Sequence, residues 1–187
     1  NEPVYYGRVV RDGGWTVLHY TFFYAMNDWR STFSGVNDHE ADWEQVMVYV
    51  EEVGDEVTPY WVAYSNHDHA GDDLRRAWDD PELVRFGEHP TVYVGGGSHA
   101  GYFRPGEYVT RVDGKAIAGV RRFTAAYRKL LRISPPPGGF GIPYVDHADG
   151  NGVILGPGGQ YEWAPRLLDP FAPWVADFHG LWGLDTA

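Results

Sequence analysis

The sequence predicts a mainly β protein, an antiparallel β-sandwich with one or two peripheral helices. Turn signals rich in Gly, Asp and Asn recur at short intervals, and the runs between them are rich in Val, Tyr, Trp, Phe and Thr. This spacing is typical of a sandwich or barrel rather than of alternating strands and helices. At 187 residues the chain is long enough to bury a substantial core, so we expect residues 1–187 to form a single β-sandwich domain.

Six runs between these turns have the composition of strands. They are rich in β-branched and aromatic residues and are bounded by turn signals such as Asp12-Gly13-Gly14. The predicted strands are Val4–Val10, Thr16–Ala25, Glu44–Val50, Tyr60–Ser65, Thr91–Val94 and Val153–Leu155.

Two helices are expected outside the sheet. The first runs from a cap at Gly71 or Asp72 to Trp78, where oppositely charged side chains one turn apart can pair. The second spans Ile117–Ile133, whose apolar residues recur along one stripe, and prolines end it. The Pro- and Gly-rich stretch that follows predicts that residues 135–187 form an arm packing back on the sandwich.

The composition excludes several classes of site. The chain has no cysteine, which excludes thiolate chemistry, zinc fingers and iron–sulfur clusters. No apolar run is long enough to span a bilayer, so we expect a soluble protein without a transmembrane segment. The chain begins at Asn1 without a methionine or a leader, which indicates a processed or trimmed chain, and export and the cytoplasm both stay open.

Charge is distributed unevenly along the chain. The net charge is −11, so nucleic acid is not an expected partner, because phosphate binding depends on clustered Lys and Arg. Acidic residues dominate 37–82, whereas residues 111–132 hold seven of the 15 basic side chains. This basic strip is either the solvated face of the second helix or an anion-docking surface.

The densest polar segment, Asn37 to Glu44, runs directly into an apolar strand. Side chains alternate between the two faces of a strand, so Asp42 and Glu44 share a face with Val46 and the valines beyond it. If that face is the core face, two carboxylates enter the mouth of the core. Buried carboxylates need a cationic partner, which could be an arginine such as Arg30, a protonated histidine or a metal ion.

Histidines follow the ends of two other predicted strands. His67 comes after the strand that ends near Ser65, and His99 comes after the strand that ends at Val94. An antiparallel pairing of Glu44–Val50 with Tyr60–Ser65 would place the start of the first strand beside the end of the second. We therefore expect five metal ligands to gather at one edge of the sheet: His39, Asp42, Glu44, His67 and His99.

This ligand set leaves the metal and the function open. Imidazole with carboxylate suits zinc, manganese or iron, whereas calcium prefers oxygen ligands, and zinc, manganese, magnesium and calcium are not distinguished. One hypothesis is a divalent-metal-containing domain that binds a polar ligand such as a glycan or lipid headgroup. The side chains available to that ligand are Trp29, Trp43, Trp61, Asp68 and His69.

Two alternatives come from other functional classes. The first is a metal-dependent hydrolase in which Glu44 or Glu40 acts as general base on metal-bound water. The second is a structural module without metal, in which the carboxylates bind backbone amides and the histidines have ordinary hydrogen-bonding partners. A spare carboxylate and an open coordination position would distinguish the hydrolase from the binding module.

Two further segments have motif-like spacing. Gly96-Gly97-Ser98-His99-Ala100 imitates a nucleophile elbow, but Ala stands where Gly is required and no helix follows. Asp146 to Gly152 is rich in oxygen ligands, but it lacks the spacing of an EF-hand loop. We therefore expect neither serine catalysis nor a calcium loop, and we interpret the second segment as a tight turn.

The sequence resembles the family named after vacuolar protein sorting-associated protein 62, which occurs in fungi, plants and bacteria. The matching stretches cover most of the chain and are Tyr24–Ser31, Asn37–Gln45, Val94–Ala100 and Phe178–Gly183. The resemblance implies no particular biochemical activity, and no role in vacuolar sorting follows from the family's name.

A shorter stretch, Asp38-His39-Glu40-Ala41-Asp42-Trp43-Glu44, is similar to the heptapeptide Gly-His-Arg-His-Asp-Trp-Glu of the necrosis- and ethylene-inducing-peptide-like cytolysins. Those proteins are β-sandwiches, and the positions matching His39, Asp42 and Glu44 hold a divalent cation in them. The resemblance therefore implies a cation at these three residues. Asp38, Glu40 and Ala41 depart from the motif. The cytolysins recognise sphingolipid headgroups, a specificity for which this sequence has no feature.

Overall fold

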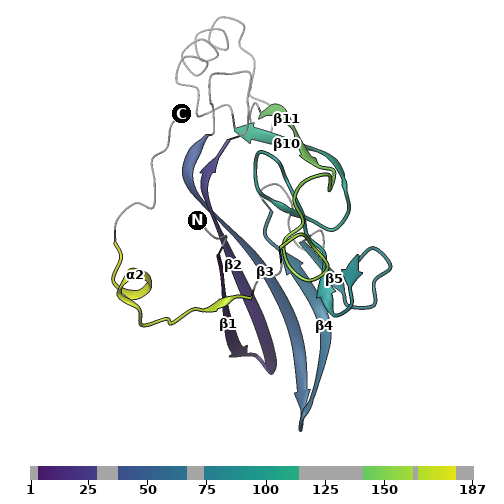
Figure 1. Cartoon of the computed structure of the whole chain (residues 1–187), viewed down its shortest axis with the longest axis vertical. Coiled ribbons are helices and arrows are strands. Elements are labelled where there is room, and N and C mark those ends of the chain that lie inside the picture. The colour runs from purple at the N-terminus through teal and green to yellow at the C-terminus, as the bar shows by residue number, and fades with distance from the viewer. Residues whose placement is uncertain (1–3, 29–37, 67–73, 114–140, 162–163, 180–187) are drawn as a thin grey trace, which may run out of the picture.

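The protein is mainly β, as predicted, and its largest element is a six-stranded sheet (Figure 1). The computed structural model describes residues 4–28, 38–66, 74–113, 141–161 and 164–179. The strand order is β12-β1-β2-β3-β4-β5, and all neighbours are antiparallel except β12 and β1. The predicted antiparallel-dominated fold class is confirmed.

The sheet is formed by four long strands that follow one another in the chain, with one short strand at each edge. They are β1 (Tyr5–Asp12), β2 (Trp15–Asn27), β3 (His39–Val53), β4 (Glu56–Tyr64), β5 (Arg75–Ala77) and β12 (Arg166–Leu167). Gly13 and Gly14 both have positive φ and form the two-residue turn between β1 and β2. That turn geometry favours glycine and matches the twist of the strands that it joins.

Three two-stranded pairs accompany the sheet. They are β6 (Arg85–Phe86) with β7 (His89–Pro90), β8 (Tyr93–Val94) with β9 (Gly101–Tyr102), and β10 (Gly106–Asp113) with β11 (Gly141–Ala148). Figure 1 shows β10 and β11 toward the end of the sheet at which β3 begins. A short helix, α2 (Pro173–Ala176), follows β12. The described helices are neither long nor apolar enough to cross a lipid bilayer.

The hydrophobic core lies on one face of β3 and β4. Burial alternates along β3 from Asp42 to Val50, so that every second side chain faces the core. The core residues of the sheet pack against side chains of the connecting segments, and Tyr64 stacks on Phe103 with ring centroids 4.2 Å apart. Burying each large apolar side chain stabilises the fold by roughly 1.5–3 kcal/mol.

The predicted helix from Gly71 to Trp78 is wrong where the structure describes it, because Arg75–Ala77 is strand β5. β5 pairs with β4, and its neighbouring arginines point to opposite faces, Arg75 over Trp61 and Arg76 over Phe103. Charge pairs one helical turn apart contribute only about 0.2–0.5 kcal/mol each. Packing of this segment against the edge of the sheet outweighs them.

Other differences lie outside the central strands. Val153–Leu155 is not a strand, since Val153 is exposed and only Leu155 forms an isolated bridge, with Tyr161. The β10–β11 pair was not predicted, because its partners are far apart in sequence. The predicted helix Ile117–Ile133 lies outside the described residues, as does most of the basic strip.

Candidate functional site

Two carboxylates lie on the core face of β3 near the point where this strand begins. Asp42 and Glu44 are each 6% exposed, and Val46, the next residue on that face, is 7% exposed. The predicted sharing of one buried face is therefore confirmed. β3 runs antiparallel to both β2 and β4, so its start lies beside the ends of those strands. The carboxylates thus lie at the end of the sheet, close to the polar residues that follow β2 and β4.

Asp42 connects this end of β3 to the turn between β8 and β9. His99 Nδ1 lies 2.9 Å from Asp42 Oδ2, and Asn27 Nδ2 donates to the same oxygen at 3.0 Å. Asn27 Nδ2 also donates to the carbonyl of Ser98 at 3.2 Å. Both partners of this amide nitrogen are acceptors, which fixes the orientation of the Asn27 amide. With Nδ1 directed at Asp42, Nε2 is the nitrogen of His99 left for a ligand or a proton.

The other end of the same amide is its oxygen, Oδ1. Asn27 is completely buried, and within the described residues its Oδ1 has no hydrogen-bond donor. Leaving a buried acceptor unsatisfied costs about 1–3 kcal/mol, so such an atom requires a donor or a cation. The unsatisfied oxygen belongs to the side chain that already binds Asp42.

Backbone strain brackets the Asp42–His99 contact. Ala41 has φ 64° and His99 has φ 57°, and no other described non-glycine residue has positive φ. The left-handed conformation costs a non-glycine residue about 1–3 kcal/mol and persists only where the surroundings fix it. Such strain is concentrated at functional sites.

Tyr24 covers the imidazole of His99. The two rings are stacked with centroids 3.9 Å apart and an interplanar angle of 5°. Tyr24 is directly opposite Asp42 in the β2–β3 register. Burial, followed by the charges of Glu44 and Asp42, raises the pKa of Tyr24 to about 12, so its phenol stays protonated at neutral pH. Together Tyr24, Asn27, Asp42, Glu44 and His99 form what we call the Asp42–His99 cluster.

Ser65 fixes Glu44. The Ser65 hydroxyl donates to Glu44 Oε2, and Ser65 Oγ accepts a hydrogen bond from the backbone nitrogen of Gln45 at 2.7 Å. The carbonyl of Ser65 accepts from the backbone nitrogen of Gly101 at 2.9 Å. The end of β4 therefore joins β3 to the segment that carries His99.

A buried carboxylate shapes the turn that presents His99. Asp146 of β11 is fully buried and accepts hydrogen bonds from the Ser98 hydroxyl, from Tyr102 Oη at 2.9 Å and from the Gly97 nitrogen at 3.3 Å. Burial, and after it the charge of Asp146, raises the pKa of Tyr102. A Cβ on Gly95 would lie 2.1 Å from Asp146 Oδ2, so this close approach requires glycine. Gly95 is the glycine of this segment that packs directly against Asp146.

The second motif-like segment is a tight turn, as predicted. Asp149 accepts hydrogen bonds from the backbone and side chain of Asn151, and Gly150 between them has φ 75°. Asp149 is exposed, whereas Asp146 is committed to the buried turn around Ser98.

The structure brings Asp42, Glu44 and His99 to the same end of the sheet. His39 stands at the start of β3, where its Nδ1 lies 3.4 Å from the carbonyl of Glu40, and Glu40 is exposed. Strand alternation places Trp43 and Trp61 on the face of the sheet opposite Asp42, with Trp43 packed against Phe23 and Trp61 paired in register with Tyr49. The remaining predicted site residues lie outside the described ranges: Trp29, His67, Asp68 and His69. Across the described ranges no three His, Asp or Glu side chains are arranged as ligands of one ion.

Sequence reasoning missed several polar residues of the site, namely Tyr24, Asn27, Ser65, Ser98 and Asp146. The signal that could have identified Asn27 is its position, because it is a polar residue at the end of an apolar strand. Asp146 offered no such signal, because its partners lie about fifty residues away in the chain.

Comparison of the chain with protein-family models, with curated protein sequences and with solved structures found no match.

Proposed function

We propose that the Asp42–His99 cluster binds a divalent cation, through which the protein binds a polar ligand such as a glycan or a lipid headgroup. The observation that carries this proposal is the buried Asn27 Oδ1, which has no donor among the described residues and belongs to the side chain that binds Asp42. Two further acceptors, the carboxylates of Asp42 and Glu44, are buried on the core face of the neighbouring strand β3. A cation would satisfy the amide oxygen and balance the carboxylate charge at once.

The donor chemistry decides which cations fit. Asp42, Glu44 and the amide oxygen of Asn27 offer hard oxygen donors, which magnesium, manganese and calcium prefer. His99 holds Asp42 through Nδ1, in the manner of residues that orient metal ligands. Its Nε2 points away from that carboxylate, so His99 would position the oxygen ligands rather than join them. The similarity of Asp38–Glu44 to the cation-binding heptapeptide of the cytolysins supports the same assignment.

The geometry favours binding over hydrolysis. A general base needs a carboxylate directed at metal-bound water. Glu44 accepts the hydroxyl of Ser65, and Glu40 is exposed. Membership of the family named after vacuolar protein sorting-associated protein 62 stays a prediction.

Metal content of the purified protein tests the proposal. The chain should be prepared without added metal and without nickel affinity resin, and its metals should be counted by elemental analysis. We expect about one divalent ion per chain, and less in Asp42→Asn and Glu44→Gln, which keep the side-chain shape but remove ligand charge. Glu40→Gln is the matched control, because it removes an exposed carboxylate from the same strand.

Two outcomes would refute the cation site. One is wild-type metal content in both Asp42→Asn and Glu44→Gln, with folding verified by circular dichroism. The other is a metal-free wild-type protein that also fails to bind magnesium, manganese, calcium or zinc in calorimetric titrations. If the ion is present, glycan and lipid panels with and without chelator would then separate a ligand-binding cation from a purely structural one.

A further inference from the structure

A small pocket lies beside the residues that follow His99 in the chain. Its volume is about 120 Å³, and its walls include Asn66, Arg76, Tyr102, Phe103, Arg104 and Tyr108. A single water needs roughly 10–15 Å³, so this pocket, which we call the Arg76 pocket, admits a group of several heavy atoms.

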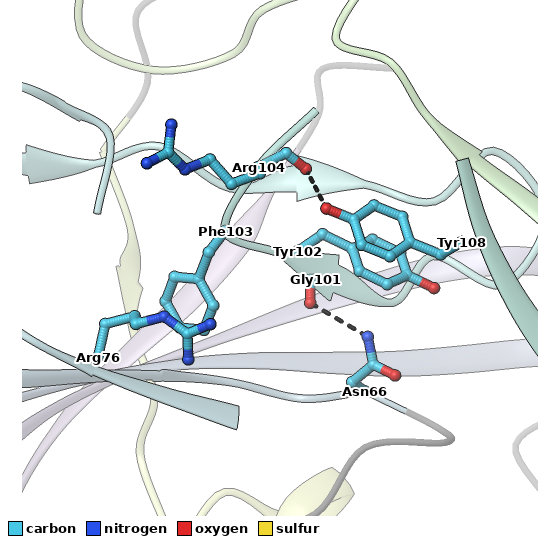
Figure 2. A pocket seen from close by; sticks show the side chains of 7 residues that line it. All are labelled: Asn66, Arg76, Gly101, Tyr102, Phe103, Arg104 and Tyr108. Atoms are coloured by element: carbon cyan, nitrogen blue, oxygen red, sulfur yellow. Dashed lines mark hydrogen bonds between the residues drawn. The ribbon is translucent and has the colours of Figure 1, made fainter. Parts of the chain in front are cut away.

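Two arginines, Arg76 and Arg104, line the pocket. Figure 2 shows the guanidinium groups of Arg76 and Arg104 on the same side, with the stacked rings of Tyr102 and Tyr108 on the other. Arg76 lies over the Phe103 ring at 4.7 Å, and Arg104 Nη2 donates to the carbonyl of Pro81 at 3.1 Å.

The positive charge also acts on Tyr108. Burial raises the pKa of Tyr108, while the charges of Arg104 and Arg76 act in the opposite direction. The negative charge of Glu82 raises the pKa of Tyr108, as burial does. Arg76 and Arg104 thus both stabilise negative charge at the position of the Tyr108 hydroxyl.

An exposed carboxylate now pairs with one of these arginines. Arg76 Nε and Nη2 each lie 3.2 Å from Glu82 Oε2, and the Glu82 side chain is 52% exposed. An exposed ion pair of this kind contributes at most about 1 kcal/mol, so a ligand can displace it. Glu82 follows Pro81, whose carbonyl binds Arg104, so the same turn contacts both arginines.

We propose that the Arg76 pocket binds a phosphate group, either inorganic phosphate or a phosphomonoester, and that Glu82 occupies Arg76 in the absence of this ligand. A guanidinium fork matches the spacing of two phosphate oxygens. The competitor Glu82 is tethered and therefore present at high effective concentration. A free carboxylate of the same charge would displace it poorly, whereas a phosphate carries a charge of about −1.5 to −2 at pH 7. The phosphate site is independent of the proposed cation, because none of these contacts involves Asp42 or Glu44.

Titration of the full chain with inorganic phosphate at constant ionic strength tests this inference, with amide NMR signals and calorimetry as readouts. We expect saturable binding, with shifts at Asn66, Gly101 and Tyr102. Arg76→Gln and Arg104→Gln should each weaken binding by about tenfold, because each removes charge-assisted hydrogen bonds. Glu82→Gln should tighten binding several-fold.

Neighbouring residues provide matched controls. Arg75 adjoins Arg76 in β5 but lies over Trp61, so Arg75→Gln should leave phosphate affinity unchanged. Asp79→Asn removes a nearby exposed carboxylate and should not reproduce the effect of Glu82→Gln. Non-saturable shifts, or equal losses in Arg75→Gln and Arg76→Gln, would overturn the proposal. If Arg76→Gln fails to fold, Arg104→Gln and Glu82→Gln still test the proposal.

A second binding experiment identifies the source of the phosphate group. Glycerol 3-phosphate should bind like inorganic phosphate if the ligand is a soluble phosphomonoester. Tighter binding to phosphatidylcholine vesicles containing phosphatidic acid than to glycerol 3-phosphate would assign a lipid headgroup. Either result supports phosphate binding at the Arg76 pocket, provided that Arg76→Gln weakens the binding. Failure of both probes to bind would contradict the proposal.

Discussion

His99 Nδ1 lies 2.9 Å from Asp42 Oδ2, and this contact joins residues 57 positions apart in the chain. Positive φ at Ala41 and at His99 brackets the contact, and Tyr24 stacks on the imidazole. The strained backbone and the ring stack present His99 to a carboxylate whose other neighbour is Asn27, and Asn27 Oδ1 has no donor within the described residues. The proposed cation would complete this arrangement.

Chelation should lower the melting temperature of metal-loaded protein. An ion that binds only the folded state stabilises it by mass action, by about 2.7 kcal/mol at one hundred times its Kd. Asp42→Asn should melt at nearly the same temperature with and without chelator, whereas Glu40→Gln should respond like the wild type. Differential scanning calorimetry measures all three. An unchanged melting temperature in wild-type protein that starts metal-loaded would argue against a structural contribution of the ion.

Gly95→Ala should destabilise the fold by about 1–3 kcal/mol, as other overpacked sites do. The new Cβ would lie 2.1 Å from Asp146 Oδ2, and Asp146 is fully buried and cannot move aside without losing its hydrogen bonds. Gly152→Ala is the control, because in the described part of the chain no atom beyond its own chain neighbours lies within 4 Å of its added Cβ. Urea unfolding of both variants measures the difference in stability. Equal stability of the two would mean that Asp146 can move aside to admit the new Cβ.

Acid should destabilise the protein partly through His19. Its Nδ1 accepts from Arg8 Nε at 2.9 Å, and its Nε2 lies 2.7 Å from Gln45 Oε1, an arrangement that suits the neutral ring. Burial lowers the pKa of His19 below its ordinary 6.5, the Gln45 hydrogen bond opposes the shift, and Arg8 adds to it.

The sign of this effect follows from proton linkage. Below about pH 6.5 the unfolded chain binds the His19 proton more readily than the folded one, so stability is full above that pH and falls below it. Denaturation between pH 7 and 5 should therefore show a shallower loss in His19→Gln than in wild type. Exposed His89 provides the control, and His89→Gln should retain the wild-type slope. Parallel profiles for His19→Gln and wild type would contradict the neutral-ring assignment.

Alkali should destabilise the protein partly through Tyr24. The pKa of this phenol is raised from 10.0 to about 12, chiefly by burial. Its contribution is complete below pH 10 and is lost as the pH rises toward 12, because the unfolded phenol ionises first. Two pKa units correspond to about 3 kcal/mol. Wild type should thus lose up to that much more stability than Tyr24→Phe over this range. Equal losses, measured by urea unfolding, would show that Tyr24 is accessible to solvent.

Local pattern was sufficient to predict the central strands and the buried carboxylates. Side-chain alternation placed Asp42 and Glu44 with Val46 because every second residue from Val46 to Val50 is valine. The short connection around Gly54 made β3 and β4 antiparallel, which set the start of one beside the end of the other. Both inferences need only residues close together in the chain.

The rest depended on contacts that local pattern does not encode. Tyr60 to Tyr64 is apolar or aromatic at every position, so alternation could not show that Trp61 faces away from the core and Val62 toward it. β5 is a strand because the edge of β4 is available to it. Asn27 and Asp146 reach the site through partners 71 and 48 residues away, at Ser98.

Paramagnetic broadening by manganese tests the cation site most directly, because it reports position as well as binding. Substoichiometric Mn²⁺ should be added to uniformly ¹⁵N-labelled, metal-free protein while amide signals are recorded. We predict selective loss of the signals of Asn27, Asp42 and His99, with those of Glu52 and Val57 at the other end of the sheet unaffected, and no selective loss in Asp42→Asn. Broadening that spares the Asp42–His99 cluster, or that persists unchanged in Asp42→Asn, would contradict the account.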